Sequence, residues 1–531
     1  MIVSANVSAR RLVIALLACV AALPSLGNRF AYDDNAIIAD NPTVHSLAGV
    51  LRAFGTSYWP AAYGGSLYRP VPIALFAVQW SVGHGAPIVF HAVNVALYVG
   101  VCLAVLALAS RLLPESWAVV TAAVFAVHPV HVEVVANVVG QSELLVTGLV
   151  VVAMIRYLDG RRGVAPLCAL YAAGLLAKEH AAVLPALFVA AELTVVDDTR
   201  PWRTRISAAR PLAAGLALTF VAYLGVRLLV LGAPLGESTL IPLVRAPWAT
   251  RWWTTMGIVP EWLRLLVWPV HLVATYAPPE VAVRTGPDAA TLAGCALIVA
   301  LGVVCVRMRR RWPVAVFGVL WAAIALVPVS NLVVPTGVLL AERSLFLPSV
   351  GGVLAGGAAF ATVRFAWPVG VVAGAIVMVG LMRSVHRAPV WHDDSTLWAA
   401  GAAESPHNYF THYMYATELY REGRDSAGEH ELRTAIALEP EDPRLYASLG
   451  WKLIAAQRCG DAVPLFRRAL DLWAVSYEAR AGLVTCLMQA GDYAGARSLS
   501  LVAVAHGGHQ AFFQHAIVAA DSASRAQSIK Q

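Results

Sequence analysis

Tyr32-Asp33-Asp34-Asn35 follows shortly after the first apolar run of this sequence, Leu12 to Gly27, which is preceded by Arg10-Arg11. The run predicts a retained signal anchor rather than a cleaved signal peptide, because its cleavage site is poor and further apolar runs follow. Two adjacent carboxylates just beyond a membrane span are groups that a membrane enzyme can use as a base.

The composition predicts an all-α polytopic membrane protein. Of the 531 residues, 59% are hydrophobic and 13% are charged, against about 25% charged in soluble proteins. The formal net charge of +7 comes from residues in short loops, which indicates membrane topology and not a nucleic-acid partner. The seven cysteines include no C-x-x-C spacing, so neither a disulfide framework nor a zinc site is predicted.

Apolar runs predict eleven membrane helices. They cover about 11–27, 88–109, 115–132, 142–158, 163–177, 180–196, 211–230, 289–306, 312–330, 345–363 and 365–382. With the N-terminus inside, every cytoplasmic loop is basic, and the C-terminal region lies outside, on the side of Asp33 and Asp34. This requires Leu231 to Pro287 to stay outside, with the charged segment 254–269 as an interfacial or re-entrant helix.

A repeat of period 34 marks the region after Trp391. Ala435 and Ala469 are separated by this period, as are Gly428, Ala462 and Ala496. Starts near Tyr409, Pro443 and Tyr477 give three helix pairs, behind a half-repeat from Asp393 to Ser405. We therefore predict two domains, a transmembrane domain over 1–385 and a tetratricopeptide α-solenoid over 391–520, which usually holds a peptide or protein segment.

Five charged or polar clusters fall in predicted outside loops or at the outer ends of spans, which favours one site there. They are Asp33-Asp34, Arg69, the stretch His128-Pro129-Val130-His131-Val132-Glu133, Lys178-Glu179 and Glu342-Arg343.

Each cluster also has a purely structural interpretation. Asp33-Asp34 could cap a helix that begins near Ala36, Lys178-Glu179 could form an internal ion pair, and Arg69 could snorkel to the interface. Arg343 could pair with Glu342 or bind an anion. His128, His131 and Glu133 could converge on a metal, but Pro129 breaks the helix and no third histidine lies nearby, so no metal is expected.

Sugar transfer from a lipid phosphate matches these residue types. A carboxylate, Asp33 or Asp34, would take the proton of the acceptor hydroxyl. Arg343, Arg69 and Lys178 would hold the phosphate as charge develops on it. Because the lipid phosphate leaves as an anion, no cofactor is required.

The order of motifs resembles that of the transmembrane and tetratricopeptide-repeat-containing O-mannosyltransferases, within the GT-C superfamily. The motifs are Phe30-Ala31-Tyr32-Asp33-Asp34, Tyr68-Arg69-Pro70, His91-Ala92-Val93-Asn94, His128 to Glu133, Val139-Gly140-Gln141-Ser142-Glu143-Leu144-Leu145, Ala177-Lys178-Glu179, and Ser330-Asn331-Leu332 through Ala341-Glu342-Arg343 to Ser349.

The resemblance implies a GT-C fold with an acidic motif, Asp33 and Asp34, in the first extracytoplasmic loop. It implies transfer of mannose from a dolichyl or polyprenyl phosphate to Ser or Thr of a protein, with the repeats on the acceptor side. Glu342, Glu179, His128, His131, Glu133 and Glu143 would support the site. The repeat array is shorter than in animal relatives, so the acceptor can differ.

The composition also bears on the compartment. A high Ala, Val and Arg content with three lysines, Lys178, Lys452 and Lys530, points to a GC-rich bacterial genome and hence to an inner-membrane enzyme facing the periplasm. Two alternatives stay open: the same fold acting on a lipid or envelope glycan, and a non-enzymatic membrane-anchored repeat scaffold. A scaffold needs only one anchor, so eleven spans argue against the second.

Overall fold

The computed structural model describes residues 7–64, 67–232, 243, 246–362, 367–505 and 510–530. These residues fold into helices joined by loops and two isolated bridges, Tyr276 with Leu340 and Pro279 with Asn408. The chain divides into two compact units. The first comprises Met1–Tyr276 and Val281–Ala400, and the second comprises Ala277–Glu280 and Gly401–Gln531.

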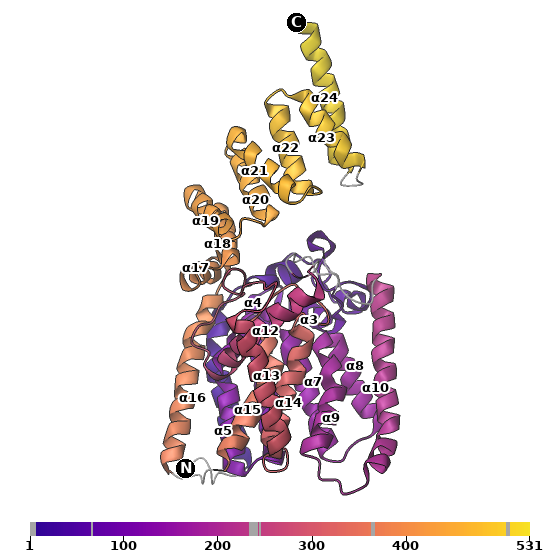
Figure 1. Cartoon of the computed structure of the whole chain (residues 1–531), viewed down its shortest axis with the longest axis vertical. Helices are drawn as coiled ribbons and strands as arrows, with labels where there is room; N and C mark the ends of the chain where they lie inside the picture. Colours follow the sequence, from indigo (N-terminus) through magenta and orange to yellow (C-terminus); the bar gives the residue numbers. More distant parts are fainter. Residues whose placement is uncertain are drawn as a thin grey trace. The chain divides into compact units, whose positions relative to one another are not determined.

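The first unit is built from membrane-type helices (Figure 1). Among the described residues, six helices are long and apolar enough to cross a membrane, and a seventh span results if Glu115–Ala126 and Pro129–Ala136, bent by 47°, count as one. The chain is therefore a multi-pass membrane protein. The helices of this unit are α1 (Val7–Ala22), α2 (Gly49–Arg52), α3 (Pro70–Gly83), α4 (Pro87–Leu112), α5 (Glu115–Ala126), α6 (Val132–Ala136), α7 (Gln141–Leu158), α8 (Val164–Ala177), α9 (Leu184–Thr194), α10 (Trp202–Leu231), α12 (Trp248–Val267), α13 (Ala289–Met308), α14 (Pro313–Leu326), α15 (Phe346–Phe360), α16 (Trp367–Arg387) and α17 (Asp394–Glu404).

A helix lies at each of the eleven predicted spans, but several are short. α8, α9, α14 and α15 have 11 to 15 residues each, fewer than the roughly 20 that span a bilayer. The count of eleven crossings therefore stays a prediction. Position 363 of one predicted span, positions 365–366 of the next, and positions 233–242 and 244–245 of the predicted outside segment lie outside the described residues. α12 forms at the expected place and is not among the six long apolar helices.

α14 and α15 pack against each other through small residues, as neighbouring membrane helices do. A Cβ at Gly318 would lie 2.5 Å from the carbonyl oxygen of Gly351. A Cβ at Gly351 would lie 2.6 Å from the Ala322 nitrogen and 2.9 Å from Trp321 Cβ. α15 follows directly on Glu342–Leu345, the turn that carries Arg343, so this contact helps to place that turn.

The second unit is the repeat region. Its helices are α18 (Tyr409–Arg421), α19 (Asp425–Leu438), α20 (Pro443–Ala455), α21 (Cys459–Leu472), α22 (Tyr477–Gln489), α23 (Tyr493–Ala505) and α24 (Gln510–Lys530). α18, α20 and α22 begin at the predicted residues Tyr409, Pro443 and Tyr477. Each start is fixed by an N-cap residue whose side chain accepts a hydrogen bond from a backbone N–H of the first turn. The N-cap residues are Asn408, Asp442 and Ser476, respectively.

Small residues at the predicted positions let these helices approach. Ala435, Ala462, Ala469 and Ala496 are fully buried. The ring of Phe466 occupies the space that side chains at Gly450 and Gly482 would need. The repeat period therefore places its small residues at helix contacts, as predicted.

The prediction of no disulfide was wrong for one pair. Cys459 and Cys486 are bonded across α21 and α22. Their separation of 27 residues matches no short cysteine motif, and only the packing of successive repeat helices brings them together. Cys19, Cys102, Cys168, Cys295 and Cys305 are free.

A methyl group at the α14–α15 contact tests this packing. Gly351→Ala is expected to lower the stability of the detergent-solubilised protein by about 1–3 kcal/mol, because backbone on both sides must move. Thermal unfolding followed by tryptophan fluorescence would measure the change. Gly352→Ala is the matched control, since a Cβ there meets no atom within 4 Å. Equal midpoints for the two variants would contradict the close contact.

Candidate functional site

Arg343 lies between two carboxylates that come from distant parts of the chain. Its Nη1 donates to Glu133 Oε1 at 2.5 Å, and its backbone nitrogen donates to Glu133 Oε2 at 2.7 Å. Its Nη2 lies 3.6 Å from Asp33 Oδ2. The side chain of Glu133 is fully buried, whereas that of Asp33 is 16% exposed. Of the two carboxylates, Asp33 is thus the one that solvent can reach.

Asp34 has a different environment from Asp33. It is fully buried, and its carboxylate accepts backbone N–H bonds from Val139 at 2.9 Å, Val138 at 3.1 Å and Ala31 at 3.4 Å. Asp34 is the N-cap residue of the π-helical turn Asn35–Ala39, but its side chain makes no capping bond to that turn. The capping interpretation was therefore wrong, and the carboxylate instead ties the first loop to the turn before α7.

Arg69 and Glu179 form a two-pronged ion pair. Arg69 Nε donates to Glu179 Oε2 at 2.9 Å, and Nη2 donates to Oε1 at 2.5 Å. The Arg69 guanidinium also lies 5.1 Å from the centre of the Tyr58 ring. This geometry replaces the snorkelling interpretation of Arg69, because the side chain is directed to a partner within the protein.

Lys178 pairs with Glu143 on α7. Its Nζ donates to Glu143 Oε1, and His180 Nδ1 lies 3.2 Å from Glu143 Oε2. Glu143 and His180 are buried, and the Lys178 side chain is 12% exposed. The alternative interpretation, an ion pair between Lys178 and Glu179, is therefore not observed: Lys178 pairs with Glu143 on α7, and Glu179 pairs with Arg69, just before α3.

Glu342 does not pair with Arg343 either. Its Oε1 accepts a bond from the Val273 backbone nitrogen at 2.5 Å and from the Tyr276 hydroxyl at 3.2 Å. The expected pairing of Glu342 with Arg343 was wrong, because consecutive residues in the turn Glu342–Leu345 point to different neighbours. Glu342 attaches this turn to the segment after α12, and Arg343 interacts instead with Glu133 and Asp33.

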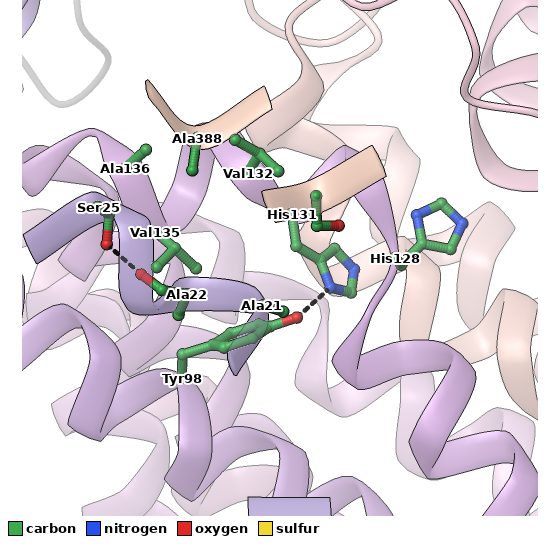
Figure 2. Close-up of a pocket in the computed structure, with 11 residues that line it drawn as sticks. Ala21, Ala22, Ser25, Tyr98, His128, His131, Val132, Val135, Ala136 and Ala388 are labelled. Carbon is green, nitrogen blue, oxygen red and sulfur yellow. Dashed lines mark hydrogen bonds between the residues drawn. The ribbon is translucent and has the colours of Figure 1, made fainter. Parts of the chain in front are cut away.

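The two histidines of the fourth cluster have separate partners. His131 Nδ1 lies 3.1 Å from the Tyr98 hydroxyl and its Nε2 lies 2.9 Å from Ser349 Oγ. His128 accepts from the Val130 nitrogen and lies 3.1 Å from the Leu266 carbonyl. Figure 2 shows the His131 ring directed to Tyr98, with His128 beyond it.

The cavity beside these rings has room for roughly one water molecule. Among the described residues, no group of three or more His, Cys, Asp or Glu side chains could hold a metal ion. Glu133, the third member of the suggested metal set, binds Arg343. Through their contacts with Tyr98, Leu266 and Ser349, His128 and His131 hold α4, α12 and α15 against the turn before α6.

The groups that oppose the effect of burial differ between Asp33 and Asp34. Burial raises the pKa of Asp33 above the usual value for aspartate, and the cations of Arg343, Arg69 and Lys178 oppose the rise. Burial raises the pKa of Asp34 to about 8, against its three backbone N–H bonds. Asp33 therefore combines partial exposure, a raised pKa and three cations from three separate loops, the combination that a general base beside an anionic leaving group requires.

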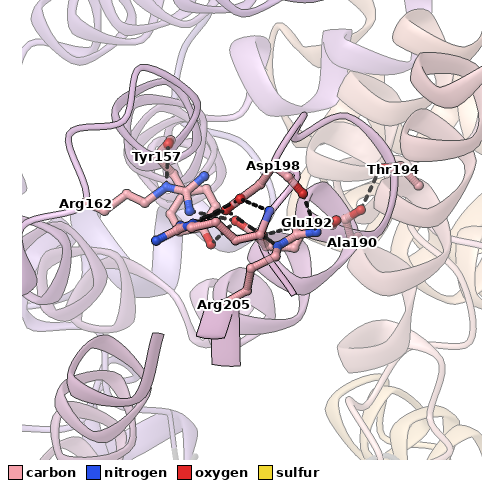
Figure 3. Close-up of polar contacts among 8 residues, drawn as sticks. Tyr157, Arg162, Ala190, Glu192, Thr194, Asp198 and Arg205 are labelled. Atoms are coloured by element: carbon pink, nitrogen blue, oxygen red, sulfur yellow. Dashed lines mark hydrogen bonds and ion pairs between the residues drawn. The ribbon is translucent and has the colours of Figure 1, made fainter. Parts of the chain in front are cut away.

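A second ionic cluster lies near the other end of α9 from Lys178 and Glu179. Glu192 accepts from the Tyr157 hydroxyl at 2.7 Å and pairs with Arg162 at 2.8 Å and with Arg205. Figure 3 shows these groups converging, with Asp198 beside them. This cluster joins the ends of α7 and α9 to the start of α10, in loops predicted to be cytoplasmic, and brings in none of the predicted site residues.

Sequence reasoning missed two contributors to the Asp33 loop. Asp394 at the start of α17 accepts a bond from the Tyr32 backbone nitrogen at 2.5 Å and from Asn35 Nδ2 at 2.8 Å. The Trp398 ring packs edge-on against Tyr32 at 5.1 Å between centres. The predicted half-repeat that starts at Asp393 was the available signal, but nothing in it indicated a contact with the first loop of the chain.

Comparison with known proteins identifies relatives over most of the chain. A tetratricopeptide repeat family model matches residues 453–505. A protein O-mannosyl-transferase of Caenorhabditis elegans is 24% identical over 442 residues, 81% of this chain and 62% of the relative. The human protein O-mannosyl-transferase TMTC1 is 25% identical over 80% of this chain and 54% of the relative.

A higher identity appears over a shorter stretch. The Drosophila melanogaster protein O-mannosyl-transferase Tmtc2 is 36% identical over 197 residues, 34% of this chain and 21% of the relative. The chain thus spans less than two thirds of the length of these relatives. The resemblance drawn from the motifs is confirmed: proteins named protein O-mannosyl-transferases are homologous to most of this chain.

The contrast between the two aspartates predicts different effects of the same substitution. Asp34→Asn should lower stability by about 1–3 kcal/mol, because an amide NH2 would face backbone N–H groups that need an acceptor. Asp33→Asn should leave stability nearly unchanged, since Asp33 is partly exposed and 3.6 Å from its partner. Thermal unfolding of both purified variants measures this. A larger loss in Asp33→Asn would contradict the assignment of Asp34 as the structural residue.

Proposed function

We propose that this protein is a membrane mannosyltransferase that moves mannose from a polyprenyl or dolichyl phosphate to Ser or Thr hydroxyls of a protein. The observation that carries the proposal is the placement of Asp33, partly exposed and 3.6 Å from Arg343, with Arg69 and Lys178 also acting on its charge. The names of the relatives support mannose as the sugar and protein as the acceptor.

In the proposed reaction, Asp33 takes the proton of the acceptor hydroxyl. The hydroxyl oxygen attacks the anomeric carbon of mannose, and the bond from that carbon to the phosphate oxygen breaks. The lipid phosphate leaves with the electron pair, and a single displacement of this kind inverts the anomeric carbon. The protein supplies the base, the position of the two substrates and positive charge for the leaving group.

Arg343, Arg69 and Lys178 are the proposed phosphate-binding groups. Each is held by a carboxylate, Glu133, Glu179 and Glu143 respectively. These partners fix the cations in place before the donor arrives, so that little reorganisation is needed during the reaction. A guanidinium has five N–H donors, so Arg343 and Arg69 retain donors beyond those given to their carboxylates.

The repeat unit supports a protein acceptor. Stacked helix pairs of this kind form concave binding surfaces, which suit a segment of an acceptor protein. The Cys459–Cys486 bond supports an oxidising compartment for the repeats, in agreement with the proposed extracytoplasmic location. A scaffold role alone would leave the charged cluster around Asp33 without a purpose.

The direct test is transfer of labelled mannose from a polyprenyl phosphate to a Ser/Thr peptide by the purified full-length protein. Asp33→Asn is expected to lower kcat by about 10²–10⁴, since an amide cannot accept the proton. Asp40→Asn is a matched control in the same loop, where the carboxylate accepts a bond from the Tyr63 hydroxyl at 2.6 Å. Wild-type rates in Asp33→Asn would reject Asp33 as the base.

The pH dependence gives a second test. The base must be ionised, so the rate falls on the acid side as Asp33 becomes protonated. Lys178→Gln removes one cation that lowers the pKa of Asp33 while keeping a hydrogen-bond donor for Glu143. The acid limb of the kcat profile should therefore move to higher pH. A limb that stays in place or moves to lower pH would contradict the proposed electrostatics.

The titratable groups that interact electrostatically with Asp33, and so act on its pKa, include Arg343, Arg69, Lys178, Glu133, Tyr32 and Asp34.

A further inference from the structure

The loop that carries Asp33 is anchored by a helix that lies far along the sequence. Both carboxylate oxygens of Asp394 are used: Oδ1 accepts the Tyr32 backbone N–H at 2.5 Å, and Oδ2 accepts the Asn35 side-chain N–H at 2.8 Å. Tyr32 and Asn35 stand on either side of Asp33-Asp34. A single side chain of α17 thus accepts hydrogen bonds from the loop on both sides of the proposed base.

Tyr32 needs such an anchor because its backbone is strained. Its φ is 57°, in the left-handed region that residues with a Cβ seldom adopt. Conformations of this kind persist only where surrounding contacts enforce them, and they gather at functional sites. Asp394 holds the Tyr32 nitrogen, Trp398 packs edge-on against its ring at 5.1 Å, and the Arg343 guanidinium lies 5.8 Å from the same ring.

The direction of the Asp33 side chain follows from these contacts. Asp34 is fixed on one side by the backbone of Val138 and Val139, and Tyr32 is fixed on the other side by Asp394. The ion pair of Asp33 with Arg343, at 3.6 Å, is too long to set the position of the carboxylate alone. The residue between two fixed neighbours takes its orientation from them.

We propose that Asp394 is a positioning residue for the transfer reaction: it holds Asp33 in the orientation in which that carboxylate meets the acceptor hydroxyl. The inference rests on the proposed role of Asp33 as the base. The division between the two units falls within α17, between Ala400 and Gly401. The helix that leads into the repeats is therefore also part of what positions the base, and removing the repeats at α17 would remove more than acceptor binding.

Two adjacent carboxylates supply a matched pair of variants. Asp393 caps α17, accepting the Thr396 backbone N–H at 3.0 Å while its own nitrogen donates to Thr396 Oγ1 at 3.1 Å. Asp393→Ala weakens the start of α17 and leaves both hydrogen bonds from the Asp33 loop to Asp394 in place. Asp394→Ala removes the hydrogen bonds from the Tyr32 backbone nitrogen and the Asn35 side chain. Asp394→Asn keeps an acceptor for Tyr32 and offers an amide to Asn35, whose own amide can turn to accept.

The first measurement is transfer kinetics with the full-length protein in detergent. Asp394→Ala is expected to lower kcat by about 100-fold, the cost of misplacing a reacting group by about 1 Å, with the donor KM within about twofold of wild type, because the phosphate-binding cations stay in place. Asp394→Asn should recover most of kcat, and Asp393→Ala should keep it. If Asp393→Ala lowers kcat as much as Asp394→Ala does, the proposal is overturned, because weakening the start of α17 would then explain both losses.

The second measurement does not depend on activity. Hydrogen–deuterium exchange of the peptide that covers residues 30–38 should speed up in Asp394→Ala and stay at the wild-type rate in Asp393→Ala and Asp394→Asn. Unchanged exchange in Asp394→Ala would overturn the positioning role whatever the kinetics. If the wild-type protein transfers no mannose, the proposed function fails, and exchange alone then decides whether Asp394 orders the Asp33 loop.

Discussion

The site depends on buried ion pairs that join loops distant in sequence. Arg343 is held by Glu133, Arg69 by Glu179 and Lys178 by Glu143. An unpaired buried charge costs several kcal/mol, so breaking one such pair by removing a single partner is strongly destabilising. Each cation is therefore committed to a carboxylate on another element. Asp33 differs, because its contact with Arg343 is longer, at 3.6 Å, than the contacts within the three pairs. This looser contact is the reason for which we propose Asp33 as the base.

The sequence predicted the elements well and their pairings poorly. Apolar runs of sufficient length and a regular repeat period are local properties, so the helix at each expected span and the starts at Tyr409, Pro443 and Tyr477 were accessible. The expected pairs Glu342–Arg343 and Lys178–Glu179 were wrong, because adjacent side chains in a turn point in different directions. Choosing the true partners requires knowing which helices are neighbours.

The same limit explains why Asp33 and Asp34 could not be told apart beforehand. Both residues are aspartates in one loop, and both fit a base or a cap. Their roles separate only when the turn Val138–Gly140 packs against the loop and presents two backbone N–H groups to Asp34. The contact of Asp394 with the Asp33 loop could not be predicted for a similar reason. Two aspartates at a helix start do not reveal that one caps the helix and the other binds a distant loop.

We propose that a lipid-linked sugar phosphate enters the cationic cluster with its sugar directed at Asp33. A structure of the protein with a bound polyprenyl phosphate mannose tests this most directly. We expect the phosphate to lie within hydrogen-bonding distance of Arg343, Arg69 or Lys178, and the anomeric carbon to lie on the side of the Asp33 carboxylate. A phosphate bound away from all three cations, or a sugar directed away from Asp33, would contradict it.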